Sequence, residues 1–167
     1  MIDSKQSLKL YLEEDKKALN ITKPFPMPWD FTWRYERLLR KCEYYINCRK
    51  DPIGKVIGAY LRLRLRYSGR KNGFYIPPNV FGKGLSIAHT GDIVINPATR
   101  IGDYCRIHVG VNIGTAAGHS DQCPHIGDNV YIGPVAKIFG NITIADNVAI
   151  GANAVVNKDC FEQNVTI

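Results

Sequence analysis

The chain has 167 residues, of which 45% are hydrophobic, and it carries a net charge of +7. Residues 1–72 hold 17 of the 22 Lys and Arg residues against 8 Asp and Glu, whereas the remainder holds 5 against 7. Because the basic charge is confined to the N-terminal part, the composition argues against a nucleic-acid platform along the rest of the chain. No apolar run approaches the ~18 residues of a membrane span, and the first residues lack a signal-peptide core. We therefore expect a cytoplasmic protein without a membrane span.

Residues 1–73 are predicted to be a helical region that caps the rest of the chain or mediates oligomerisation. Three helices are expected, opening at Asp3 or Ser4, at Asp30, and at Asp51-Pro52. Their expected apolar faces are Leu8, Tyr11, Leu12 and Leu19; Phe31, Tyr35, Leu38, Cys42 and Tyr45; and Ile53, Val56, Ile57, Tyr60 and Leu61.

The segment 61–66 alternates Leu and Arg, which also fits a strand. It continues the third helical pattern without a breaker, so we expect a helix that ends near Gly69. Its arginines then form either a solvated face on an oligomerising helix or a face that docks to an anionic surface or substrate.

From Phe81 to Val156 an aliphatic or small residue recurs at every sixth position. The leading positions are Phe81, Ile87, Ile93, Thr99, Cys105 and Val111, with a second series at Ile95, Ile101, Ile107 and Ile113, and a downstream series at Ile126, Ile132, Ile138, Ile144, Ile150 and Val156. Neither a 3.6-residue helix nor a period-2 sheet produces this spacing, but a triangular coil of three short strands does. Residues 74–167 are therefore predicted to form a parallel β-helix.

Residues 114–125 interrupt the repeat, and this polar, Gly-rich stretch is expected to be an extruded loop. All four histidines lie in the loop or before it. His89 stands in an open Gly/Thr turn, as a general base requires, and His108 follows it by close to one 18-residue coil. The two imidazoles should therefore be neighbours on adjacent coils, roughly 5 Å apart. An ordinary surface histidine remains the alternative at both positions.

Cys123 is either a pocket-lining or structural thiol, or a nucleophile. The chain offers no CxxC or HxxxH spacing, so we expect no metal site. The odd number of scattered cysteines indicates thiols rather than a disulfide framework.

Four segments closely resemble the hexapeptide-repeat acyltransferases, in particular the serine acetyltransferase branch and its exopolysaccharide O-acetyltransferase relatives. These segments are Ile87-Ala88-His89-Thr90-Gly91, 107–114 (IHVGVNIG), 123–127 (CPHIG) and 132–140 (IGPVAKIFG). The resemblance implies a left-handed parallel β-helix, a homotrimer that can pair into a dimer of trimers, and acetyl-CoA in the groove between subunits.

The resemblance also implies roles for particular residues. His89 matches the catalytic histidine, with His108 beside it as a second catalytic candidate. Acetyl-CoA is expected to contact Gly114, Thr115, Pro134, Lys137 and Ala152. Asp92 and Cys123 are expected to be substrate-binding, and Asp92 or a backbone carbonyl is expected to orient His89.

Three positions depart from the serine acetyltransferase pattern. Ala88 stands where those enzymes carry an aspartate, Phe74 or Tyr75 where they carry an orienting aspartate, and Gln122-Cys123 where they carry an Arg-His pair. Serine is a zwitterion that needs a partner for each charge. We therefore expect transfer of acetyl to a sugar hydroxyl in polysaccharide synthesis.

Serine O-acetylation is the first alternative. A non-catalytic assembly module built on the same repeat is the second. A carbonic-anhydrase-like enzyme would need a set of zinc histidines that the chain does not offer.

Overall fold

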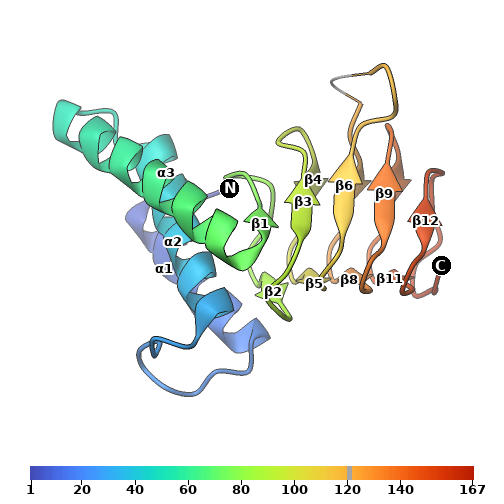
Figure 1. Cartoon of the computed structure of the whole chain (residues 1–167), viewed down its shortest axis with the longest axis horizontal. Helices are drawn as coiled ribbons and strands as arrows, with labels where there is room; N and C mark the ends of the chain where they lie inside the picture. Colours follow the sequence, from blue (N-terminus) through green and yellow to red (C-terminus); the bar gives the residue numbers. More distant parts are fainter. Residues whose placement is uncertain (120–121) are drawn as a thin grey trace.

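The computed structural model describes residues 1–119 and 122–167 as three helices followed by a parallel β-helix (Figure 1). The helices are α1 (Lys5–Ala18), α2 (Phe31–Cys48) and α3 (Pro52–Asn72). The strands are β1 (Phe74–Tyr75), β2 (Ser86–Ile87), β3 (Ile93–Ile95), β4 (Arg100–Ile101), β5 (Arg106–Ile107), β6 (Asn112–Gly114), β7 (His125–Ile126), β8 (Tyr131–Ile132), β9 (Lys137–Phe139), β10 (Thr143–Ile144), β11 (Ala149–Ile150) and β12 (Val155–Val156). In the part of the chain that the structure describes, no helix is long and apolar enough to span a membrane.

The strands form three parallel sheets, which are the three faces of a triangular prism. Sheet A has the order β1-β3-β6-β9-β12, sheet B the order β10-β7-β4, and sheet C the order β11-β8-β5-β2. The leading residues of the six-residue repeat fill the interior, where Ile87, Ile107, Ile132 and Ile150 are all 0% exposed. The predicted solenoid is therefore confirmed. Figure 1 shows the coils in one row, with the helices at one end and the C-terminal residues at the other.

Aspartates stacked on successive coils hold one edge of the prism together. The Oδ1 atom of Asp128 accepts a hydrogen bond from the backbone N–H of Asp103 at 2.7 Å, and Asp146 does the same for Asp128. Asp103 accepts from the backbone N–H of Lys83 at 2.9 Å. Each carboxylate thus satisfies a backbone donor of the preceding coil, at a turn where a short strand leaves that donor without a sheet partner.

All three helices start where the sequence analysis predicts, and in two of them the cap side chain makes the expected hydrogen bond. The side chain of Ser4 accepts from Ser7 N at the start of α1, and that of Asp51 accepts from Gly54 N at the start of α3. Asp30 precedes α2, but its side chain makes no cap hydrogen bond there. It accepts instead from Met27 N and pairs with Lys23.

The predicted apolar face of α3 is only partly right: Leu61 is buried and Ile57 packs against the core, but the other three residues are exposed. Ile53, Val56 and Tyr60 are 69%, 71% and 56% exposed, and the helix runs to Asn72 rather than ending near Gly69. The buried residues of α3 are Gly54, Gly58, Leu61, Leu65 and Gly69. Gly58 faces Tyr45 of α2, where an added Cβ would stand 3.5 Å from Tyr45 Cβ, an ordinary packing contact. On the second helix, Phe31 is likewise exposed, at 46%.

A buried network of charged side chains joins the helices to the first coil. Arg40 of α2 is 0% exposed and pairs with Asp15 at 2.8 Å and with Glu43 at 3.0 Å. Its guanidinium also donates to the carbonyl oxygens of Phe81 and Gly82. The arginine therefore ties two helices to the open end of the solenoid.

The carboxylates of this network satisfy backbone donors that no preceding coil can pair. Asp15 accepts from Leu85 N at 2.9 Å, and Glu43 accepts from Asn79 N at 2.8 Å. Glu36, also buried, accepts from Ile87 N at 2.8 Å. The exposed edge of a sheet is a row of unpaired backbone groups, and here side chains of the helices take the place of the missing strand.

Glu36 gives this junction a pH dependence. Within the described residues its Oε2 atom is buried without a hydrogen-bond partner. Burial first, and then the charge of Asp15, raise the pKa of Glu36 well above its ordinary value of 4.5. The folded protein then holds a proton that the unfolded chain releases. The free energy of unfolding therefore falls as the pH rises from the ordinary pKa through the raised one.

We predict that Glu36→Gln flattens this pH dependence. Glutamine keeps an oxygen that accepts from Ile87 N, and it cannot ionise. The free energy of unfolding of the variant, relative to that of the wild type, should therefore increase with pH. Urea unfolding at several values between about pH 5 and about pH 8 measures the effect. Glu13→Gln, on the exposed face of α1, is the matched control and should follow the wild type. If the free energies of unfolding of Glu36→Gln and of the wild type changed with pH in parallel, the pKa of Glu36 would be the same in the folded and unfolded states, which would contradict the prediction.

Candidate active site

The two predicted catalytic histidines lie on one edge of the prism, where strands of sheet C lead into strands of sheet A. We call this the C–A edge; it consists of the turns at residues 88–92, 108–111, 133–136 and 151–154. His89 follows β2 and His108 follows β5. Their ring centroids are 6.1 Å apart with planes inclined by 62°. The coil period therefore brings the imidazoles together, as the sequence spacing predicts.

His108 is held between aromatic neighbours. Its ring centroid lies 5.1 Å from that of Tyr131, which is on the next coil. In the part of the chain described, its Nε2 atom is buried and has no hydrogen-bond partner. Burial first, and then the charges of Arg106 and His89, lower the pKa of His108 below its ordinary value of 6.5. His108 is thus a neutral imidazole with an unused polar atom beside the candidate base.

Sequence reasoning missed three polar residues beside the histidines: Ser86, Arg106 and Tyr131. They are registered neighbours on sheet C. The Nη1 atom of Arg106 donates to Ser86 Oγ at 2.9 Å. The signal that identifies them is register: each lies on the outer surface of its coil, two residues before the position that opens the C–A edge.

The structure gives no side-chain partner to His89 within residues 1–119 and 122–167. Asp92 lies three residues further on, and its backbone carbonyl accepts from Gly110 N at 2.6 Å. The Asp92 side chain is exposed and no hydrogen bond joins it to His89. The orienting and substrate-binding roles of Asp92 therefore stay predictions.

The residues expected to contact acetyl-CoA divide between two edges. Pro134 and Ala152 lie on the C–A edge, where the carbonyl of Pro134 accepts from Asn153 N at 2.9 Å. Lys137 begins β9 beside this edge, and its Nζ donates to the Gly110 carbonyl at 2.5 Å. Gly114 and Thr115 stand at the opposite end of β6, where the chain leaves the prism.

Val135 marks a strained point on the C–A edge. It adopts φ of 66°, whereas the same turn on the neighbouring coils carries Gly110 at 79° and Asn153 at 61°. Glycine and asparagine tolerate this left-handed conformation, but a β-branched residue does not adopt it readily. Strain of this kind is typical of functional sites.

The expected loop begins after β6 and returns at β7. Ser120 and Asp121, within the predicted loop, lie outside the described residues. Cys123 is only 2% exposed and precedes β7, away from the C–A edge. Within the chain it is therefore a buried thiol that the structure does not bring to His89, and its substrate-binding role stays a prediction.

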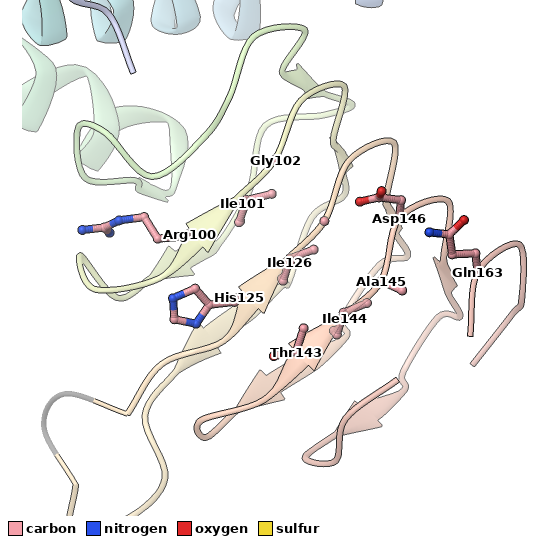
Figure 2. A pocket seen from close by; sticks show the side chains of 11 residues that line it. Arg100, Ile101, Gly102, His125, Ile126, Thr143, Ile144, Ala145, Asp146 and Gln163 are labelled. Carbon is pink, nitrogen blue, oxygen red and sulfur yellow. The ribbon is translucent and has the colours of Figure 1, made fainter. Parts of the chain in front are cut away.

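Sheet B carries a shallow hollow of about 450 Å³ (Figure 2). Arg100, His125 and Thr143 are registered neighbours along it, and Figure 2 shows Asp146 and Gln163 on its other side. The hollow lies on a face that does not include the C–A edge, so it is separate from the paired histidines.

No group of three or more His, Cys, Asp or Glu residues that could hold a metal ion occurs among residues 1–119 and 122–167.

Comparisons with known proteins first define the class. Residues 123–158 match the family model "Bacterial transferase hexapeptide (six repeats)". Serine acetyltransferase isoform 3 from Entamoeba histolytica has a similar structure, with a TM-score of 0.74 and 26% identity over 96% of this chain and 58% of the other. The structure thus belongs to the hexapeptide-repeat class, with a left-handed parallel β-helix.

Sequence relatives define the family more closely. The chain is 32% identical to the serine acetyltransferase of Helicobacter pylori over 95% of its own length and 89% of the relative's. It is 39% identical to that of Synechococcus elongatus over 100 residues, which are 59% of this chain but only 41% of the relative. The chain belongs to the serine acetyltransferase family.

This finding overturns the expectation of a sugar acceptor in polysaccharide synthesis. That expectation rested on missing charged residues at Ala88 and Gln122-Cys123, in the positions where the family carries them. The relatives at 32–39% identity are serine acetyltransferases and favour serine instead. The argument counted charges only at the family's motif positions. It overlooked Arg106, which lies two residues before His108 and whose charge acts on that imidazole.

Proposed function

We propose that the protein transfers the acetyl group of acetyl-CoA to the hydroxyl of L-serine. The observation that carries the proposal is the pair of imidazoles on the C–A edge of a chain in the serine acetyltransferase family. The edge suits a slender thioester substrate that ends in phosphates, because it is lined by small residues such as Pro134 and Ala152 and has Lys137 beside it.

In the proposed reaction His89 is the general base. It accepts the proton of the serine hydroxyl while the hydroxyl oxygen bonds to the acetyl carbonyl carbon. The carbon–sulfur bond then breaks, and the proton passes from His89 to the departing thiolate. Bound acetyl-CoA supplies the activated acetyl group. The ring of His108 lies beside the base, and its pKa, lowered chiefly by burial, favours the neutral imidazole there.

We infer that the working form is a homotrimer. Gly114, Thr115 and the loop stand at one edge of sheet A and His89 at the other, so a neighbouring copy would bring a second set of these residues to each histidine. The outer row of sheet A also carries exposed apolar side chains on either side of Asn112 and Lys137. Tyr75, Val94 and Val155 on this surface are 62%, 42% and 65% exposed.

Sedimentation equilibrium tests the assembly. We expect a species of three chains at micromolar concentration, or of six if trimers pair through the helices. We expect Val155→Glu to shift the distribution towards smaller species, because it places a charge among the apolar side chains of sheet A. A monomer in the wild type that is active at the same concentration would contradict a site shared between copies.

The acceptor and the base are tested together by following thiol release from acetyl-CoA. The wild type should release thiol in the presence of L-serine, with formation of the serine ester. His89→Ala should lower kcat by roughly 10²–10⁴-fold, the usual contribution of a positioned general base. The affinity of His89→Ala for CoA should change little. His108→Ala should lower kcat by a smaller factor than His89→Ala does. Absence of serine-dependent thiol release in a correctly assembled wild type would disprove the proposed function.

A further inference from the structure

Beside His89 lies a polar cluster that the proposed reaction has not yet used. It consists of Ser86, Arg106, His108 and Tyr131, and we call it the sheet C cluster. Arg106 and Ser86 are directly paired in the register of β5 and β2, and Arg106 and Tyr131 in that of β5 and β8. His89 is three residues beyond Ser86, and its ring lies edge-to-face with that of His108.

Arg106 is the cation of this cluster. It forms no ion pair with any residue in the ranges 1–119 and 122–167, and its side chain is exposed. The outward positions of sheet C around it are Ser86, Ala88, His108, Tyr131, Gly133 and Ala149. None of these is acidic, so the local charge favours an anion.

The geometry of the guanidinium leaves a binding surface free. The hydrogen bond to Ser86 Oγ uses Nη1 and anchors one end of the group at 2.9 Å. The Nε and Nη2 atoms make no hydrogen bond to any described residue. Parallel N–H groups of arginine match the two oxygens of a carboxylate, which a lysine or a neutral side chain does not reproduce.

Serine presents the group that this surface fits. Its carboxylate is separated from its hydroxyl by two carbon atoms, so both reach neighbouring protein groups at the same time. A carboxylate removed from water without a cation is strongly disfavoured. The loop offers Gln122-Cys123 rather than an arginine, and Ala88 places no carboxylate next to Arg106 to neutralise it.

We propose that Arg106 binds the carboxylate of the acceptor amino acid while His89 faces the hydroxyl of the same molecule. Arg106 is then a specificity-determining residue that selects hydroxy-amino acids with a free carboxylate over their amides. This inference rests on the proposed function, because it names how the serine of that reaction is recognised.

The test compares L-serine with L-serinamide, which keeps the hydroxyl and the amino group but lacks the negative charge. The wild type should prefer serine. Arg106→Gln should raise the KM for serine by about 10–100-fold, as expected for loss of a hydrogen-bonded charged partner, with a smaller effect on kcat. Its kinetics with serinamide should remain close to wild type. Arg106→Lys should recover part of the preference.

Arg100→Gln is the matched control. Arg100 opens β4 on sheet B as Arg106 opens β5 on sheet C, and both are exposed, so the control should keep the wild-type preference. If Arg106→Gln lowered kcat/KM equally for serine and serinamide, Arg106 would be only a structural support for Ser86. That result would overturn this inference and leave the proposed function standing. A wild type that acetylates neither compound would disprove the proposed function, and the inference with it. An unchanged KM for serine in Arg106→Gln would also overturn it.

Discussion

The rest of the structure depends on how the first coil of the solenoid is closed. A parallel coil pairs its backbone with the coil before and the coil after, and the first coil has no predecessor. Here Arg40, buried and paired with Asp15 and Glu43, supplies donors to the carbonyls of residues 81–82. The carboxylates accept from backbone N–H groups of the same coil. Burying these charges is costly, and the cost is offset because nearly every charged group meets an opposite charge or a backbone partner.

This closure also places the candidate base. Glu36 accepts a hydrogen bond from the N–H of Ile87, two residues before His89, so the helical region fixes the strand that leads into the His89 turn. The helices are therefore more than an appendage to the solenoid. They determine the position of its first working coil, and the following coils repeat that geometry through their inward isoleucines.

Sequence alone could predict the repeat, the interior residues and the neighbouring positions of His89 and His108. The reason is that a six-residue period fits a triangular coil of three short strands. The full face of α3 could not be predicted. Its apolar residues suggested one side of the helix, but only part of that side is buried, and the buried set also includes Gly54, Gly58 and Gly69. A hydrophobic pattern indicates which large side chains are buried, but it does not identify the glycines that share the buried face of a helix.

The limits at the candidate site have a similar cause. Motif positions pointed to missing charges at Ala88 and Gln122, and this led to the wrong acceptor. The cation at Arg106 lies two residues before His108, outside the motif positions. Strand register pairs it with Ser86 on the preceding coil, which carries His89. The buried network was equally hidden, since Asp15 and Arg40 are on different helices and sequence gives no pairing between them.

The most direct test of this account is the stability of Arg40→Met compared with Lys41→Met. The two residues are adjacent on α2, but Arg40 is buried in the network and Lys41 is exposed. Removing Arg40 leaves Asp15 and Glu43 buried without their cation, and breaking a buried ion pair in this way costs about 3–5 kcal/mol. Urea unfolding should show a loss of that size for Arg40→Met and less than about 0.5 kcal/mol for Lys41→Met. Equal stability of the two variants would contradict the claim that buried charges close the solenoid.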